Sequence, residues 1–390
     1  MNSELKFDDL APRVTRFAAV VGVVGLVGGI GCALIAEDGA ARLLRAYLVN
    51  YGYFLSLSLG ALFFVLLQHL TRSGWSVVVR RLGETVACNV LPLAVLGIPL
   101  LVWSRHLYPW ADPEVAHGLP DGKRLWLEAF AVRAVVCFVV WVLLARFFFL
   151  TSVRQDATGD VGLTLRMQRI SAPAMLAYAV TVTFFAFDLL MSLDPNWYST
   201  IFGVYYFAGG VVGFFALLTL LAMAAQRAGK LTHAITAEHY HDLGKLVLAF
   251  TVFWAYIAFS QYMLIWYANI PEETQWLIRR QTGGWAVVSL LLLFGHFAVP
   301  FLVLISRPAK RHKGLLAAAA AWVLLMHWVD LHWLVMPGAT GRALPDVFEI
   351  CCLVGLGGLF LAAAAHRLRD RSLIPQRDPR LAESLTFENV

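Results

Sequence analysis

The chain has 390 residues, of which 59% are hydrophobic and only 14% are charged, and its mean hydropathy is +0.69. Soluble domains are roughly 25% charged, so this composition excludes a water-soluble fold and indicates an all-α polytopic integral membrane protein. The net charge of +6 does not indicate a nucleic-acid partner, because the basic residues are scattered through the loops between apolar runs.

Apolar runs long enough to cross the bilayer recur about ten times along the chain. A helix needs about 20 such residues to span roughly 30 Å of hydrocarbon. The runs predict one transmembrane domain over 17–366, between an N-terminal segment over 1–16 and a polar tail over 367–390. The predicted helices cover 17–36, 47–70, 82–103, 127–150, 170–192, 201–226, 245–269, 283–306, 313–336 and 346–366.

The third predicted helix differs from the others because Pro92 and Pro99 interrupt it. A proline inside a span frees a backbone carbonyl, which neighbouring helices must satisfy in hydrocarbon. We therefore expect this helix to pack inside the bundle.

The loops divide into two sets with very different charge. The set that includes both chain ends carries 21 Lys and Arg residues, and the alternate set carries 8. This asymmetry predicts that both termini lie in the cytoplasm. The acidic N-terminus and the absence of a small-residue cleavage pattern predict no removable signal peptide. The tail, which is polar and contains two prolines, is expected to be either a disordered end or a segment lying on a neighbouring subunit.

Six ionisable side chains are predicted to lie in the outer half of the membrane: Arg133, Asp188, His327, Asp330, His332 and Glu349. A charge at the bilayer centre costs at least about 2.5–3.5 kcal/mol, so each of them is a candidate functional group. His327 and Asp330 are spaced i,i+3, so the carboxylate is expected to orient the imidazole, whereas His332 points the opposite way.

These groups suggest a path that passes protons towards the outer surface. Arg133 requires a buried carboxylate, which Asp188 or Glu349 would supply. His296, four residues before Pro300, would continue the path inward, although a lone histidine in an apolar helix is also typical of a core residue. The alternative is that the charged groups form static ion pairs that join helices, or that they pair with another subunit.

No catalytic residue, metal ligand or covalently bound cofactor is predicted. The five cysteines lie in apolar stretches without C-x-x-C spacing, which argues against an iron–sulfur cluster or zinc. A b-type haem would need two histidines facing each other at matched depth on different helices, and no pair offers this.

Two stretches are specific beyond composition, SLDPNWYSTIFGVYY over 192–206 and FWAYIAFSQYMLIWYANIPEET over 253–274, and the tail contains IPQRDPRL over 374–381 with ESL over 383–385. Asp194 and Pro195 close a tight turn, and Gln261 and Tyr262 place hydrogen-bonding groups inside a helix. With the ten-helix layout, these stretches resemble the ActF subunit of bacterial alternative complex III, a relative of NrfD-like membrane subunits. The resemblance covers nearly the whole chain.

The resemblance implies a membrane subunit of a respiratory quinol:cytochrome c oxidoreductase in the bacterial inner membrane. It implies two four-helix bundles, formed by helices two to five and six to nine, with the first and tenth helices peripheral. The implied partners are a larger homologous quinol-binding membrane subunit, an external iron–sulfur subunit, c-type cytochrome subunits and a terminal oxidase. These partners would carry the haem and iron–sulfur clusters, and the one ligand suggested for this chain is quinone or quinol.

Three functional hypotheses follow. The first is a subunit without redox cofactors, not catalytic alone, that supports complex assembly and proton transfer, with a quinone head group against Trp197, Tyr256, Gln261 and Tyr262 by residue type. The second is a secondary transporter that works alone, because ten helices with prolines and buried charges also suit alternating access. The third is a purely structural scaffold subunit.

Overall fold

The computed structural model describes residues 4–338 and 343–389, so residues 1–3, 339–342 and 390 of the predicted segments lie outside the description. Within the described residues the chain is helical, and it forms no strand beyond a single bridge between Lys6 and Ser372. Ten segments are long and apolar enough to span a membrane. The chain is therefore an all-α polytopic membrane protein, as predicted.

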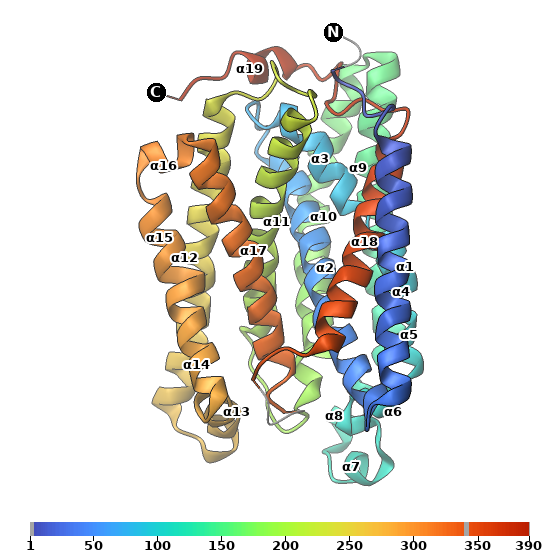
Figure 1. Ribbon diagram of the computed structural model, residues 1–390, viewed down its shortest axis with the longest axis vertical. Coiled ribbons are helices and arrows are strands. Elements are labelled where there is room, and N and C mark those ends of the chain that lie inside the picture. The colour runs from blue at the N-terminus through green and yellow to red at the C-terminus, as the bar shows by residue number, and fades with distance from the viewer. Residues whose placement is uncertain (1–3, 339–342, 390) are drawn as a thin grey trace.

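The ten spans alternate in direction, so the described ends of the chain lie at the same end of the molecule (Figure 1). We call this the terminal end and the opposite end the distal end. Eight spans are single helices: α1 (Ala11–Ile35), α2 (Gly39–Leu70), α9 (Phe130–Thr158), α10 (Val161–Leu189), α11 (Phe202–Arg227), α12 (Ala237–Ala268), α17 (Lys313–Val335) and α18 (Val347–Leu368). The third span is broken into α3 (Val77–Ala87), α4 (Val90–Leu96) and α5 (Ile98–Val102). The eighth span consists of α14 (Gly284–Leu291), the π-helix η3 (Leu292–Ala298) and α15 (Val299–Leu304).

Short helices cover both ends. The distal end carries α6 (Ser104–Leu107), η1 (Pro109–Ala111), α7 (Pro113–His117), α8 (Asp121–Glu128), η2 (Met191–Leu193) and α13 (Pro271–Gln281). The terminal end carries α16 (Arg307–Arg311) and α19 (Leu381–Leu385). Several spans extend past the predicted apolar runs, because a helix can continue beyond the hydrocarbon once its ends are capped. The Asp160 side chain, for example, accepts from the Gly162 N–H at 2.7 Å and starts α10 outside the apolar run.

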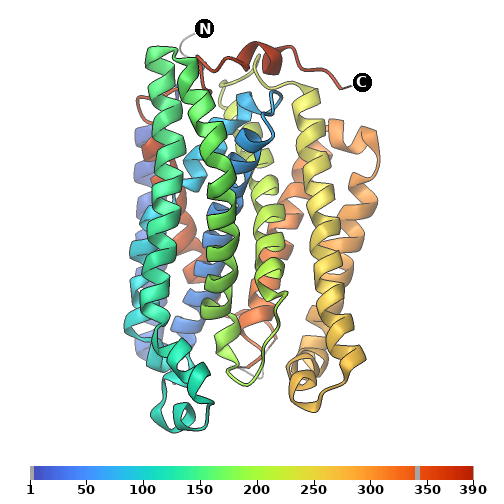
Figure 2. The same ribbon diagram turned by 180° about the vertical axis from the view of Figure 1, so that it is seen from behind.

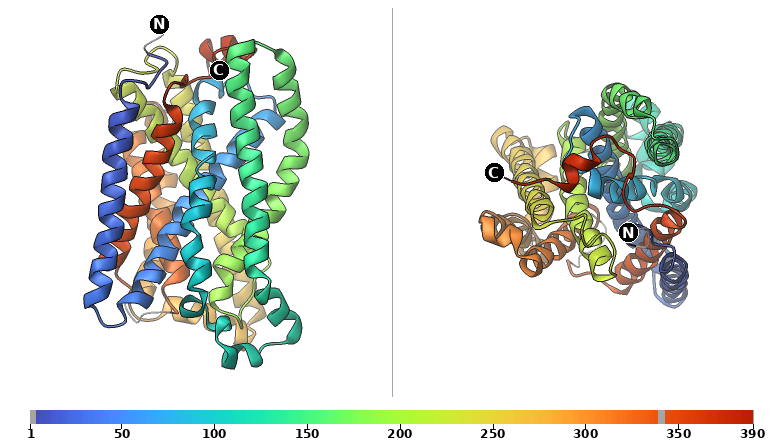
Figure 3. Two further views of the ribbon diagram at one scale, coloured as in Figure 1. Left: turned by 90° about the vertical axis from the view of Figure 1, so that its right-hand side faces the viewer. Right: turned by 90° about the horizontal axis from the view of Figure 1, so that it is seen from above.

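Eight of the ten spans pack as two groups of four, which we call the first and second bundles; Figures 2 and 3 show how their helices are arranged. In the first bundle, α2 packs against α3, α4, α9 and α10; in the second, α11 packs against α12 and α17, which also contact η3 and α15. The two bundles meet mainly along α2 and α11, the two most buried spans. These helices approach closely where Gly60 faces Gly210, since a Cβ on Gly60 would lie 2.4 Å from the Gly210 carbonyl oxygen.

The first and last spans, α1 and α18, lie together beside this core. Glycines on both helices allow the close contact, as in other small-residue interfaces of membrane helices. A Cβ on Gly25 would lie 2.6 Å from the backbone nitrogen of Gly355. The outward face of α1 remains exposed, with Phe17, Val24 and Leu34 at 74%, 64% and 84%.

The broken third span only partly follows the prediction. Pro92 leaves the Cys88 carbonyl without its helical donor, and the Arg367 guanidinium on α18 donates to that carbonyl at 3.1 Å. Tyr47 and Tyr51 on α2 donate to other carbonyls of α4. Neighbouring helices therefore satisfy this span, as expected. However, only α3 is fully enclosed, because α4 and α5 keep one face towards the membrane.

The tail is neither a disordered end nor a segment held only by a neighbouring subunit, because it lies across the terminal end of its own chain (Figure 1). Asp378 forms a buried ion pair with Arg80 on α3. The Ser384 hydroxyl donates to the Trp75 carbonyl at 2.6 Å, and the Ser384 carbonyl oxygen lies 3.0 Å from Nε2 of His239 on α12. The tail thus contacts both bundles.

The glycine contact between α1 and α18 can be tested with one pair of variants. We expect Gly25→Ile to destabilise the protein by about 1–3 kcal/mol, because the new side chain must push α1 away from α18. Gly31→Ile on the same helix is the matched control, since nothing lies within 4 Å of a Cβ there. Thermal unfolding in detergent measures both, and equal losses would contradict the proposed contact.

Candidate functional site

The second bundle contains a buried polar cluster around Asp330 on α17. Its Oδ1 accepts from the Tyr205 hydroxyl at 2.5 Å, and its Oδ2 accepts from Nε1 of Trp254 at 3.1 Å. Both donors come from other helices, α11 and α12. Asp330 is 1% exposed and, among the described residues, makes no ion pair, so only neutral donors stabilise this carboxyl group.

His327 lies one turn before Asp330, and Ser56 rather than Asp330 orients it. The Ser56 hydroxyl donates to the Tyr53 carbonyl at 2.7 Å, so its oxygen accepts from Nε2 of His327 at 2.8 Å. Nδ1 of His327 then has no hydrogen-bond partner among the described residues. The prediction that Asp330 holds this imidazole is therefore wrong, although both side chains lie against Gly209.

His296 completes the cluster from the π-helix η3. Its ring stacks on Trp254 at a centroid distance of 4.0 Å and lies 6.4 Å from the His327 ring. Pro300 cannot donate to the His296 carbonyl, which explains why the helix widens just before the proline. His296 is fully buried, and neither ring nitrogen has a partner within the described part of the chain.

A membrane-facing cavity of about 720 Å³ borders this cluster. Tyr205 and Trp254, the two donors to Asp330, form part of its wall. The remaining lining residues are Ala255, Ala258, Phe259, Gln261, Tyr262, Trp276, Leu277, Gln281, Ala286, Ser289, Leu290, Leu292, Leu293, Phe297 and Trp333. The cavity is mostly aromatic and aliphatic with a few polar groups, as ligand pockets are.

The four residues suggested for quinone contact occupy different places. Gln261 and Tyr262 line the cavity. Trp197 is buried behind it, with its ring stacked on Trp276 at 4.2 Å. Tyr256 is 64% exposed and is not part of the lining.

Arg133 and Asp188 form a separate cluster in the first bundle. The guanidinium donates to both carboxylate oxygens at 2.8 Å, and Nε1 of Trp126 donates to the same carboxylate at 3.0 Å. The guanidinium also lies 3.9 Å above the Trp126 ring. Asp188, and not Glu349, is thus the partner of Arg133. This arrangement satisfies both charges and is typical of a structural ion pair.

A third cluster joins α17 to α18. Nδ1 of His332 lies 3.7 Å from Oε1 of Glu349, and both side chains are buried. His332 faces away from Asp330, as predicted. Glu349 also caps α18 by accepting from the Asp346 N–H at 3.1 Å. Burial raises the pKa of Asp346, but hydrogen bonds with Glu349 and Arg42 outweigh burial and hold that pKa below its ordinary value.

All six predicted groups lie in the distal parts of their helices, but the described contacts place them in three clusters. Arg133 and Asp188 contact each other, His332 contacts Glu349, and the group around Asp330 includes His296. Across the described residues, no chain of hydrogen bonds connects the three clusters. The continuous outer path expected from the sequence is therefore not present as direct contacts.

Two buried basic sites were not identified from the sequence, the pair Arg80 and Arg81 on α3 and the single residue Arg280 on α13. Arg80 and Arg81 fall in a predicted loop, yet α3 begins at Val77 and buries both, with Glu84 between them at 3.3 and 3.0 Å. The spacing of Glu84 from these arginines, i,i+3 and i,i+4, could have predicted that the three residues pair on one helix.

Arg280 on α13 is the other missed group. It donates to carbonyls at the end of α17, and its guanidinium lies 3.5 Å from the Trp276 ring centroid. Burial, followed by the neighbouring Arg279 charge, lowers the pKa of Arg280 to about 9. The guanidinium closes the distal side of the second bundle, next to the cavity.

The fold and these clusters define a polytopic helical membrane protein whose second bundle holds a hydrogen-bonded polar cluster beside a cavity. Neither family models nor curated protein sequences match the chain. In the described part of the chain, no three His, Cys, Asp or Glu side chains are grouped so that they could hold a metal ion.

The Arg133 ion pair predicts a large effect on stability. We expect Asp188→Ala to lower the free energy of unfolding by about 3–5 kcal/mol, because it leaves Arg133 without a counter-charge. The double variant Arg133→Met with Asp188→Leu should recover most of this loss. Denaturant unfolding in mixed micelles measures the effect.

The matched control is Asp121→Ala, which removes the nearer of the two carboxylate partners of the more exposed Arg124. We expect this change to cost less than about 1 kcal/mol. A similar loss for Asp121→Ala and Asp188→Ala would mean that burial adds nothing to the Arg133 pair.

Proposed function

We propose that the chain is an ActF-like membrane subunit of a quinol-oxidising alternative complex III, and that its second bundle binds a quinone or quinol head group beside Asp330. In this proposal the protein lies in the bacterial inner membrane with both termini in the cytoplasm. It carries no redox cofactor, and its haem- and iron–sulfur-containing partners accept the electrons.

One observation carries the proposal. The 720 Å³ cavity opens among membrane-spanning helices, and its wall includes both donors to a buried carboxyl group. Its volume is within the range of about 300–1,000 Å³ that holds small organic ligands. Gln261 and Tyr262 supply polar atoms that suit quinone oxygens, while Phe259 and Leu293 suit an isoprenoid tail.

The chemistry fits a carboxyl group at this position. Oxidation of a quinol to a quinone releases two electrons and two protons, so a proton acceptor must lie near the head group. Tyr205 contacts Asp330 and also faces the cavity, so it can relay a proton between them. His327 and His296 lie on the other side of the same cluster and offer unpartnered nitrogens as further proton acceptors.

The distribution of basic residues supports the orientation. With 21 Lys and Arg residues on one set of loops and 8 on the other, the terminal end would face the cytoplasm. The Asp330 cluster and its cavity would then lie in the outer half of the membrane, where protons from quinol oxidation are released.

Purification tests the assignment to a complex. The tagged chain, extracted in mild detergent from its native membrane, should co-purify with c-type haem, visible in the absorption spectrum, and with an iron–sulfur subunit identified by mass spectrometry. A colourless protein that is stable alone would contradict the assignment to a respiratory complex.

The cavity is tested by filling it. We expect Ala258→Trp to lower the quinone that co-purifies with the chain at least about tenfold, because the indole occupies the space of the head group. Ala321→Trp on the exposed face of α17 is the matched control and should leave the quinone content unchanged. Chromatography of extracted quinone, per mole of protein, gives the result.

Replacement of the carboxyl group separates a proton path from a scaffold. We expect Asp330→Asn to leave the complex assembled but to lower quinol turnover by about a hundredfold, the usual contribution of a positioned acid or base. Glu128→Gln, at the exposed end of α8, should keep full turnover. Loss of assembly with Asp330→Asn and normal turnover of the remainder would favour a structural scaffold.

One observation favours a transporter as the second candidate. The third and eighth spans are both interrupted, at Cys88–Asn89 and Gly97 in one and at the π-helix in the other, and they correspond if the chain is divided into two sets of five helices. Broken helices at matching positions suit alternating access. The purification experiment discriminates, because a transporter stays intact without haem-containing partners.

A further inference from the structure

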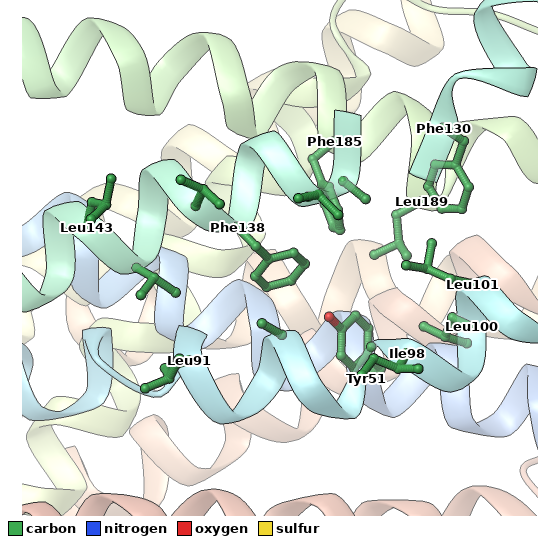
Figure 4. A pocket seen from close by; sticks show the side chains of 16 residues that line it. Tyr51, Leu91, Ile98, Leu100, Leu101, Phe130, Phe138, Leu143, Phe185 and Leu189 are labelled. Atoms are coloured by element: carbon green, nitrogen blue, oxygen red, sulfur yellow. The ribbon is translucent and has the colours of Figure 1, made fainter. Parts of the chain in front are cut away.

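A second cavity, of about 420 Å³, lies in the first bundle between α9 and the broken third span. Figure 4 shows Leu91 and Leu143 at one end of it, Leu101 and Phe130 at the other, and Phe138 between them. The lower-numbered part of the third span and the later part of α9 both lie towards the terminal end, so the groove runs along the membrane normal.

This groove is open to the membrane on its side. Three of its lining residues, Ile98, Val135 and Leu143, are 50%, 57% and 64% exposed. Its lining is otherwise aliphatic and aromatic, and the Tyr51 hydroxyl already donates to the Leu93 carbonyl at 3.0 Å. An occupant of this groove must therefore be a hydrocarbon chain.

Three arginines gather at the terminal end of the groove. Arg371 donates to the Arg367 carbonyl at 3.1 Å, and its guanidinium lies 4.9 Å from the Phe149 ring centroid. Arg146, one turn beyond Leu143 on α9, interacts electrostatically with Arg367. Arg146 and Arg371 both add positive potential at the Arg367 guanidinium, and an anion among the three would lower their mutual repulsion.

None of these three arginines forms an ion pair within the described residues. The guanidinium of Arg367 donates to the carbonyls of Thr85 and Cys88 and to Oδ1 of Asn89. The nearby Asp370 is 3.5 Å from Arg369, a different arginine. The cluster therefore keeps an uncompensated positive charge at the membrane boundary.

The apolar groove and the cavity beside the arginines are adjacent, because one residue lines both. Leu91 lines the apolar groove, and it also lines a cavity of about 670 Å³ whose other walls include Arg367 and Arg371. One molecule with a long apolar chain and an anionic group can reach both sites at once.

We propose that this side of the first bundle is a binding site for an anionic diacyl phospholipid, with one acyl chain in the groove along α4 and α9 and the phosphate at Arg146, Arg367 and Arg371. Guanidinium groups bind phosphate through paired N–H donors, and basic residues at a membrane surface attract anionic lipid. The bound lipid fills the groove left open by the break in the third span, and it neutralises the arginines. The site is independent of the quinone cavity, which lies in the other bundle.

Lipid retention tests the site on the full chain, with its co-purifying partners. The protein is exchanged into dodecyl maltoside micelles that contain either phosphatidylglycerol or phosphatidylcholine with the same acyl chains, and bound lipid is counted by native mass spectrometry. We expect preferential binding of phosphatidylglycerol. Arg146→Gln with Arg371→Gln should weaken this binding about fivefold for each charge removed.

Two further variants make the test specific. Ala94→Phe, which fills the groove, should lower phosphatidylglycerol binding without changing charge. Arg154→Gln with Arg169→Gln removes two exposed arginines from the same end of the neighbouring helices and should have no effect. Circular dichroism confirms that each variant is folded.

Three results would overturn the proposal: equal retention of the two lipids, an equal loss from the control pair, or displacement of the lipid by glycerol 3-phosphate alone. The last result would mean that a phosphate site exists without an acyl-chain site.

Discussion

The need to satisfy backbone hydrogen bonds in hydrocarbon determines how this bundle is arranged. Two spans are interrupted near prolines, and in both of them donors on other helices bond to backbone carbonyls beside the interruption. Arg367 on α18 satisfies the Cys88 carbonyl of the third span. In the eighth span, where the π-helix bonds each N–H to the carbonyl five residues earlier, Pro300 cannot donate to Gly295, and Nε1 of Trp322 on α17 donates to the Gly295 carbonyl at 2.7 Å instead. These contacts explain why α18, although peripheral, must lie next to the third span, and why α17 must lie next to the π-helix.

The buried polar groups fall into two kinds when their partners are compared. The Arg133 guanidinium and the Asp188 carboxylate satisfy each other with two hydrogen bonds, so this cluster needs nothing more from its surroundings. The cluster around Asp330 is different, because His296 has two unpartnered nitrogens and His327 has one. An unpartnered polar atom in a low-dielectric interior is destabilising, so such atoms concentrate where a ligand or a proton completes them.

The sequence was sufficient for the elements whose determinants are local. All ten spans were predictable, because the bilayer fixes the length of each apolar run. The i,i+3 spacing correctly placed His327 and Asp330 on one face, and the opposite direction of His332 followed from the same helix geometry.

The partners of these residues were not predictable, because they depend on which helices adjoin. The i,i+3 spacing suggests that His327 and Asp330 bond to each other. Instead, His327 bonds to Ser56 on α2, and Asp330 accepts from Tyr205 on α11. The prediction for the tail was wrong for a related reason. Its polar, proline-containing sequence resembles a disordered end, but Asp378 and Ser384 find buried partners on two different bundles.

The two ends of the molecule differ in how their polar groups are held, and this difference bears on function. At the terminal end, Glu84 bridges two arginines and the tail adds Asp378, so charge pairs fix α3 and the tail together. At the distal end of the second bundle, neutral hydrogen bonds surround one carboxyl group beside a cavity. The proton exchange that we propose at this site requires a frame that does not move with each protonation, because a shift of an ångström disturbs a hydrogen-bonded relay. In this proposal the ion pairs at the terminal end would supply that frame, since their charges would not change if Asp330 gained or lost a proton.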